Sequence, residues 1–155
     1  IPVSPSWFDA MSNIKACSQE DDLHCVIHWD SKPEGAPAYE RPEPSLCTNP
    51  LSWRTDEEIA DASLNEGALP RAGKRNDAIG KAPDTPSNQK VTALKQPISA
   101  LTSAQCKGGT LYVGEPISPG FKVDRLGTYH LLDYSLFYMN IHNNAKLRAQ
   151  SILTP

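Results

Sequence analysis

The chain alternates short apolar runs with long polar stretches, so its pattern predicts only a few short elements. Ser4-Pro5 is typical of a helix start, with serine as the N-cap and proline at the first helical position. Apolar residues then recur at helical spacing at Trp7, Met11 and Ile14. This spacing predicts an apolar-faced helix over residues 5–15.

Continuous apolar runs predict the strands. Residues 25–29 form a short, nearly unbroken apolar run, which is typical of a buried strand. Residues 110–113 and 121–123 predict two further short strands, and residues 1–3 are interpreted as the end of another. The proline-rich stretch at 30–44 predicts a loop.

Two more helices are expected. Thr55 and Glu58 stand at the spacing of a capping box, which predicts a short helix reaching about Leu64. Asp133 is placed to cap a longer C-terminal helix that runs to about Gln150. The first turns of that helix are apolar nearly all round and its end is basic, so it is expected to begin buried and finish at the surface.

Residues 65–104 show almost no periodicity and are punctuated by proline and glycine. Such a long irregular stretch inside a compact domain is typical of a lid, a binding loop or a linker. The strands predicted around it are too few and too short to make a stable sheet alone. We therefore expect the chain to depend on another polypeptide, or on an upstream part of its own precursor.

The composition narrows the class of protein. Only 39% of the 155 residues are hydrophobic and 7% are aromatic, while 9 glycines and 14 prolines break the chain. The net charge of −3 offers no basic face for nucleic acid. No apolar run is long enough to span a membrane. The chain begins at Ile1 without a methionine, which we interpret as a processed product or a piece of a longer one.

Four cysteines allow three disulfide pairings. The pairing Cys17–Cys25 would close a short loop ahead of a strand, and Cys47–Cys106 would then clamp the base of the irregular middle. Zinc is a rival, but the spacings fit no common structural site. Two disulfides are favoured over free thiols, which places the chain in a secreted or periplasmic compartment.

Several blocks of the chain resemble a bacterial family of secreted α/β-hydrolase-like proteins, lipase- or esterase-like in character, whose function is unassigned. The block Cys-Thr-Asn-Pro-Leu-Ser-Trp at residues 47–53 carries the most specific part of this resemblance. Residues 16–29, 106–113 and 129–134 match further blocks in the same order. The resemblance covers most of the chain outside residues 66–104.

The resemblance implies an α/β fold in which residues 1–155 are the C-terminal part of one hydrolase domain. Its sheet would consist of parallel strands with helices on both faces, and residues 65–104 would be a lid-like insertion. The nucleophilic serine would lie upstream, yet the chain contains no Gly-x-Ser-x-Gly motif. The implied partner is an N-terminal hydrolase chain or segment that carries this serine, and the implied substrate is a small ester. No cofactor is expected.

His130 is the candidate general base, because α/β-hydrolases carry this histidine on a loop before the last helix. The simpler alternative is a histidine that caps a turn or bonds a backbone carbonyl. Asp30 is the first candidate for the acid that orients His130, since it follows the strand at 25–29. Asp56 is the second, although the capping box also explains it. Helix capping is the role we expect for Asp133.

Four aromatic residues near these blocks are candidates for lining a substrate pocket, with core packing as the alternative: Trp29, Trp53, Tyr129 and Tyr134. His24 and His28 share the i,i+4 spacing of helical zinc ligands. In a strand, however, this spacing separates the residues by about 13 Å, which is too far for one ion. A metal site is therefore not expected.

The sequence thus leaves three functions open. The first is a serine esterase or lipase-like hydrolase to which this chain supplies the histidine and the acid. The second is a secreted, disulfide-stapled binding or inhibitor domain that uses residues 65–104 as its contact surface. The third is a catalytically inactive relative of the hydrolases that binds through the same fold.

Overall fold

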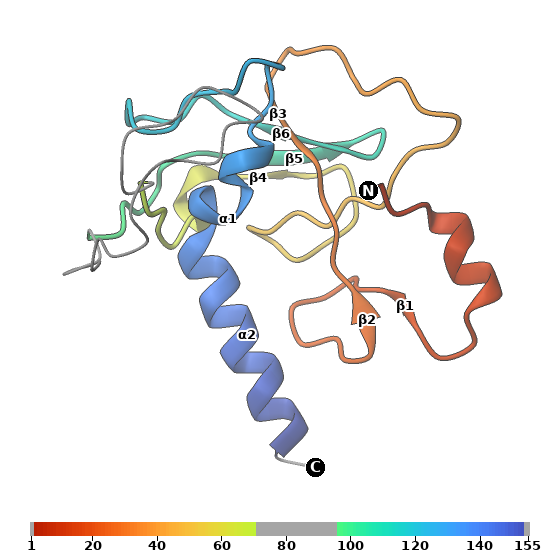
Figure 1. Ribbon diagram of the computed structural model, residues 1–155. Helices are drawn as coiled ribbons and strands as arrows, with labels where there is room; N and C mark the ends of the chain where they lie inside the picture. Colours follow the sequence, from red (N-terminus) through yellow and green to blue (C-terminus); the bar gives the residue numbers. More distant parts are fainter. Residues whose placement is uncertain (1, 71–95, 154–155) are drawn as a thin grey trace, which may run out of the picture.

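The computed structural model describes residues 2–70 and 96–153. A four-stranded mixed sheet forms the centre of the molecule, and two C-terminal helices lead away from it (Figure 1). In chain order, the elements are the 3-10 helix η1 (Pro5–Ala10), strands β1 (Lys15–Ala16), β2 (Cys25–Val26), β3 (Ser31–Pro33) and β4 (Ile59–Ala60), the 3-10 helix η2 (Ala62–Leu64), strands β5 (Ala104–Lys107) and β6 (Thr110–Val113), the 3-10 helix η3 (His130–Leu132), and helices α1 (Asp133–Leu136) and α2 (Tyr138–Leu153).

The sheet has the strand order β3-β6-β5-β4. Strands β5 and β6 form an antiparallel hairpin closed by Gly108 and Gly109, whose φ angles of 56° and 75° suit the two-residue turn. β4 adds antiparallel to β5, and β3 adds parallel to β6, with Ser31 opposite Leu111. The strand predicted at residues 110–113 is confirmed as β6.

The core lies between this sheet and the start of the C-terminal helices. Leu136 and Phe137 are fully buried at the junction of α1 and α2. They pack with apolar residues of the sheet and of its connecting loops: Cys47, Leu51, Ala60, Ala68, Leu101, Ala104, Cys106, Leu111, Val113, Phe121, Tyr129 and Leu132. As expected from the sequence, the C-terminal helical segment begins buried.

The C-terminal helix is broken where one continuous helix was predicted. Phe137 separates α1 from α2, and its φ of −121° lies outside the helical range. Asp133 is the first residue of α1 and does not cap it. Its carboxylate instead faces Ser31 and His130, so the predicted capping role is wrong.

The predicted helix over 5–15 is wrong beyond its first turns. η1 ends at Ala10, Met11 is extended, and residues 15 and 16 belong to β1. The apolar face of the segment stays exposed, with Trp7, Met11 and Ile14 each at least 41% accessible. A short helix is stabilised mainly by packing of its apolar face. Within the described residues this face stays exposed, so the helix does not extend beyond Ala10.

The helix predicted from the capping box at 55–58 does not form. The side chain of Asp56 accepts a hydrogen bond from the backbone N–H of Glu58, as in an Asx turn. Glu57 binds the β5–β6 hairpin instead: its carboxylate accepts a hydrogen bond from the backbone N–H of Gly108 at 3.1 Å. The chain then pairs as β4 with β5, so these tertiary contacts override the local helix signal.

Strand boundaries also differ from the expectation. The strand predicted at 25–29 is limited to residues 25 and 26, which pair in parallel with β1. The stretch 30–44, predicted as loop, begins with β3 at the edge of the main sheet. Residues 121–123 form no strand, because a tight turn follows at Asp124 and no neighbouring strand offers a ladder.

The ends of the segment 65–104 are part of the core. Ala68 and Ile98 exchange two backbone hydrogen bonds of 2.9 Å, and Leu101 is fully buried. The side chain of Asn65 donates to the carbonyl of Leu136, and Asn140 donates to Leu64. The central part, 71–95, lies outside the described residues, as does Ile1 of the strand predicted at 1–3.

Both predicted disulfides are confirmed. Cys17–Cys25 closes an eight-residue separation, and Cys47–Cys106 joins two segments 59 residues apart, with Cα–Cα distances of 5.0 and 5.8 Å. The described part of the chain has no free cysteine. Cys47–Cys106 ties the loop that follows β3 to β5, so it holds the middle of the chain on the sheet.

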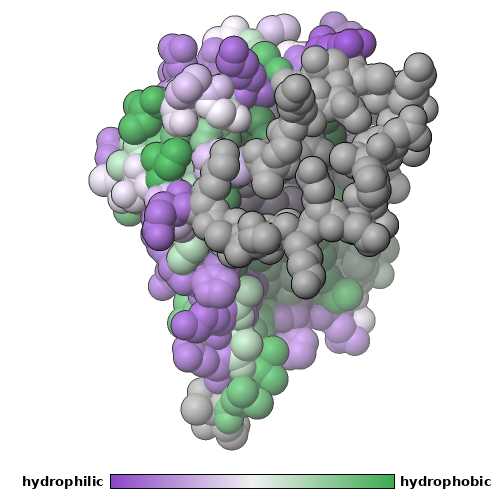
Figure 2. Space-filling model, turned by 60° about the vertical axis from the view of Figure 1, so that its left-hand side comes forward, coloured by the Kyte–Doolittle hydropathy of each residue, from purple (hydrophilic) through white to green (hydrophobic). Residues whose placement is uncertain are grey.

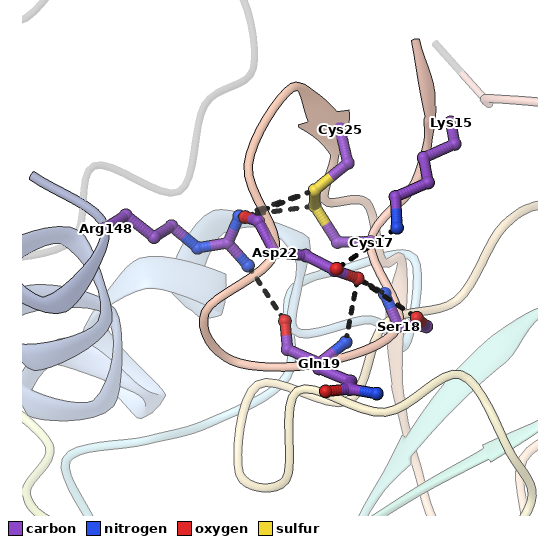
Figure 3. Close-up of polar contacts among 7 residues, drawn as sticks. All are labelled: Lys15, Cys17, Ser18, Gln19, Asp22, Cys25 and Arg148. Atoms are coloured by element: carbon purple, nitrogen blue, oxygen red, sulfur yellow. Dashed lines mark hydrogen bonds and ion pairs between the residues drawn. A yellow bond between two sulfur atoms is a disulfide. The ribbon is translucent and has the colours of Figure 1, made fainter. Parts of the chain in front are cut away.

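Arg148 fastens α2 to the loop closed by Cys17–Cys25 (Figure 3). Its guanidinium donates to the carbonyls of Gln19 and Asp22 and lies 3.3 and 3.5 Å from the two disulfide sulfurs. Within α2, its Nε donates to Asn144 at 2.6 Å. Burial lowers the pKa of the Arg148 guanidinium from its ordinary value. One arginine therefore satisfies two carbonyls of the disulfide-closed loop.

The end of α2 projects from the body of the molecule and carries hydrophilic and hydrophobic residues side by side (Figure 2). Ile152 and Leu153 are 67% and 80% exposed there. None of the helices in residues 2–70 and 96–153 is long and apolar enough to cross a membrane.

Replacing Arg148 by methionine is expected to lower the free energy of unfolding by about 1–3 kcal/mol, because the loop carbonyls lose a charged donor. Amide exchange in residues 18–24 should accelerate more than exchange in β5 and β6. Lys146→Met, on the exposed face of the same helix, is the matched control and should change neither measurement. Unchanged loop protection in Arg148→Met would contradict the assignment.

Candidate functional site

A tight turn places His130 at the surface beside the sheet edge. Asp124 accepts backbone hydrogen bonds from Leu126 and Thr128 through its carboxylate, and Gly127 takes the left-handed φ of 69° that closes the turn. The hydroxyl of Thr128 donates to Asp124 and accepts from the backbone N–H of His130. The loop before His130 is therefore fixed by its own hydrogen bonds.

The local helix type brings His130 and Asp133 together. η3 is a 3-10 helix, whose three residues per turn place residues i and i+3 on the same side. Nδ1 of His130 lies 3.3 Å from Oδ2 of Asp133. The His130 side chain is 64% exposed and that of Asp133 only 9%. A buried carboxylate thus holds one nitrogen of a solvent-facing imidazole.

Asp133 is also bonded to the sheet. Its Oδ1 accepts a hydrogen bond from the hydroxyl of Ser31, a fully buried residue of β3. The backbone N–H of Tyr129 donates to the carbonyl of Ser31 at 3.2 Å, so the same residue also fixes the loop before His130. Strand β3 consequently positions both members of the His130–Asp133 pair.

Burial raises the pKa of the Asp133 carboxyl from its ordinary 3.8 to about 6. The hydrogen bond from Ser31 and the proximity of His130 oppose this rise, while the charge of Asp30 adds to it. Above that pH the carboxylate is ionised and can accept a hydrogen bond from Nδ1–H of the imidazole. An ionised acid on Nδ1 leaves Nε2 as the basic nitrogen.

Asp30, the first candidate acid, lies near the same imidazole but is engaged elsewhere. Its Oδ1 is 3.8 Å from Nδ1 of His130, while its Oδ2 forms a 2.6 Å ion pair with Arg41. Arg41 in turn donates to the hydroxyl of Ser45. Asp133 is therefore the better-placed acid, and Asp30 is the second carboxylate of the cluster.

Asp56, the second candidate acid, lies in a different part of the molecule. It pairs with Arg54 at 2.5 Å and borders a depression together with Ser18, Gln19 and Thr55. His130 does not line that depression. The structure thus separates Asp56 from the candidate base.

His130 and Asp30 both border two adjoining hollows. The larger, which we call the Tyr39 cleft, has a volume of about 490 Å³ and is lined by Pro2, Asp30, Lys32, Tyr39, Arg41, Asp124, Leu126, Thr128, His130 and Leu131. The smaller, the Trp29 hollow, has about 230 Å³ and is lined by Ile27, His28, Trp29, Asp30, His130, Asp133 and Tyr134. The imidazole stands where the two meet.

The four candidate pocket aromatics divide into two pairs. Trp29 and Tyr134 line the Trp29 hollow, with their ring centroids 6.3 Å apart, and Tyr134 is 72% exposed. Trp53 and Tyr129 are buried at 6% and 5% accessibility and line neither hollow. Trp53 and Tyr129 are therefore buried in the core, as the alternative to a pocket role predicted.

Several residues of the cluster had no sequence signal. The contact between Ser31 and Asp133 spans 102 positions, so no local pattern predicts it. Lys32, Tyr39 and Arg41 fall in the stretch that we predicted as loop. The spacing of His130 and Asp133 was a usable signal, because three residues apart is one turn of a helix.

No metal site is evident within residues 2–70 and 96–153. No group of three or more histidine, cysteine, aspartate or glutamate side chains there could hold an ion. His28 is bonded through Nδ1 to the carbonyl of Leu46 at 2.8 Å, and His24 has a positive φ of 57°. The chemistry that the cluster offers is proton transfer through Nε2 of His130.

Comparison of the chain with protein-family models, curated proteins and solved structures found no match. The α/β-hydrolase architecture therefore remains a prediction. Of the pairings in the main sheet, only β3 with β6 is parallel, whereas the resemblance implies a sheet of parallel strands.

The raised pKa of Asp133 predicts a pH-dependent stability. The unfolded chain ionises this carboxyl near 3.8 and the folded protein near 6, so ionisation opposes folding. Stability from this group is fully present below about pH 4 and is lost as the pH rises through about 6. The variant Asp133→Asn lacks this titration. Its free energy of unfolding should therefore rise relative to that of the wild type as the pH increases, by at most about 3 kcal/mol.

Urea unfolding between pH 4 and 7.5 measures this difference. Asp61→Asn is the control of opposite sign, because hydrogen bonding to Ser63 lowers the pKa of Asp61. Its stability relative to the wild type should fall as the pH rises from below about 3 to about 4. Above that it should stay nearly constant, because Asp61 is ionised in both the folded and the unfolded state, so the control is measured from about pH 2.5. A pH-independent difference for Asp133→Asn would show that the carboxyl is not held in its raised state.

Proposed function

We propose that the chain supplies the histidine and the acid of a serine-type ester hydrolase, with His130 as the general base and Asp133 as the residue that orients it. The serine would be carried by an N-terminal segment or a separate chain. The observation that carries the proposal is the His130–Asp133 pair, in which a buried carboxylate holds Nδ1 while the imidazole faces two hollows.

In this mechanism, Nε2 of His130 takes the proton of the serine hydroxyl as its oxygen attacks the ester carbonyl. The histidine then gives that proton to the departing alcohol, which leaves an acyl-enzyme. Water attacks the acyl group, again losing a proton to Nε2, and the carboxylic acid and free serine are released. Ester and water are converted to acid and alcohol, with no external oxidant or reductant.

Three further observations support the proposal. Within residues 2–70 and 96–153, the contacts of the His130 imidazole with Asp30 and Asp133 are both made through Nδ1, and Nε2 is the nitrogen that we propose faces the serine. Ser31 is not itself the nucleophile, since it is fully buried and its hydroxyl donates to Asp133. Asp133 lies closer to Nδ1 of His130 than Asp30 does, at 3.3 Å against 3.8 Å, and Asp30 adds negative charge beside it.

The two disulfides also indicate the compartment in which we propose the protein works. Structural disulfides persist in oxidising compartments, so we propose a secreted or periplasmic hydrolase. Trp29 and Tyr134 line the hollow beside the base and are the aromatic residues that we propose contact the substrate. The same fold without a serine partner would be a disulfide-stapled binding domain, a second candidate favoured by the continuous buried core.

A fluorophosphonate probe tests the proposal on the natural gene product that contains these residues. The probe should label a serine, and native mass spectrometry should show that the labelled segment and this chain form one molecule or complex. A 17 kDa monomer without a labelled serine would overturn the hydrolase and leave the binding domain.

His130→Ala is expected to abolish both labelling and the hydrolysis of model esters. Asp133→Asn should reduce kcat about 10²–10⁴-fold, because the imidazole loses the carboxylate that sets its tautomer. Asp30→Asn should reduce it less, and Asp56→Asn, remote from the imidazole, should leave turnover near that of the wild type. A larger loss in Asp30→Asn than in Asp133→Asn would restore Asp30 as the acid.

A further inference from the structure

The Tyr39 cleft contains four charged side chains besides His130, and three of them are in an ion pair or accept several hydrogen bonds. Asp30 and Arg41 form an ion pair at 2.6 Å. The carboxylate of Asp124 accepts from two backbone N–H groups and from the hydroxyl of Thr128. The remaining charge is Lys32 of β3, which follows Asp30 by two positions and lines the same cleft.

Lys32 is held in place without being neutralised. Its Nζ lies 4.0 Å from the centroid of the Tyr39 ring and donates to the carbonyl of Pro37 at 2.7 Å. Arg41 lies over the same ring at 4.4 Å, so two cations share one aromatic side chain. Within the described chain no carboxylate pairs with Lys32, and an ammonium has three donors. The cleft therefore presents, at a defined position, one ammonium that pairs with no carboxylate of the described residues.

The same cleft also presents apolar surface. Leu126 and Leu131 line it and are 75% and 56% exposed. Two exposed leucines in the lining of a cleft favour a ligand with a hydrocarbon part, while a few placed polar groups set its orientation. A ligand that combines a hydrocarbon chain with one anionic end would match both features.

We propose that the Tyr39 cleft binds a carboxylate-bearing ester, with Lys32 holding the carboxylate and Leu126 and Leu131 contacting the hydrocarbon between that group and the ester. This substrate class rests on the proposed function, because it places the ester bond beside His130. Lys32 is a specificity-determining residue in this arrangement and takes no part in proton transfer.

Matched esters of equal acyl length test the proposal on the natural gene product. The ratio of kcat/KM for the p-nitrophenyl monoester of adipate to that for p-nitrophenyl hexanoate should exceed one. Lys32→Met should lower this ratio about fivefold or more, mainly through KM for the adipate ester. Lys32→Arg should retain most of the ratio, and Lys146→Met on α2 should keep it unchanged. A ratio that Lys32→Met does not alter would overturn the proposal.

Binding without turnover separates this proposal from the hydrolase assignment. Titration with adipate should give saturable backbone amide shifts at Lys32, Thr128 and His130, which weaken in Lys32→Met and at high salt. Absence of saturable shifts would refute carboxylate binding even if neutral esters are hydrolysed. Saturable shifts in a protein that hydrolyses neither ester would support carboxylate binding and overturn the hydrolase alone.

Discussion

The buried carboxylate of Asp133 is the constraint on which the arrangement around His130 depends. A carboxylate removed from water must be neutralised or hydrogen-bonded, and here one oxygen accepts from Ser31 of β3 while the other faces His130. These contacts do not fully offset the cost, because the pKa of Asp133 is still raised to about 6. The fold retains the group because it joins the sheet edge to the turn that carries the imidazole.

Asp30 is a second carboxylate beside Asp133, and its charge adds to the cost of burying Asp133 in the ionised form. The ion pair between Asp30 and Arg41 moderates this effect. Asp30 lies 3.8 Å from the same imidazole nitrogen, and its charge contributes to the raised pKa of Asp133. Asp30, which the sequence favoured as the acid, forms a 2.6 Å ion pair with Arg41. Burial and the charge of Asp30 also raise the pKa of the Tyr39 hydroxyl, which lies beside Arg41. The charges of β3 and of the loop after it thus act as one network.

Apart from the Cys47–Cys106 disulfide, the sequence predicted the features that depend on local chemistry and failed on those that depend on distant contacts. Both disulfides and the strand β6 were predicted correctly, and His130 lies at a surface turn before the last helix, as its sequence position suggested. The capping box at 55–58 failed because Glu57 bonds the β5–β6 hairpin 51 positions away. The sequence predicts helix capping for Asp133, because no local pattern indicates its contact with Ser31, which stands 102 positions earlier.

The three-residue strand β3 organises most of the candidate site because of where it lies in the sheet. It is the edge strand of the order β3-β6-β5-β4, so its inner side pairs with β6 while its outer side is available to the His130 loop. The carbonyl of Ser31 uses that outer side to accept from Tyr129. Side chains alternate along a strand, so Ser31 points inward to Asp133 while Asp30 and Lys32 border the cleft. An exposed edge, usually a liability, is here occupied by the loop that it positions.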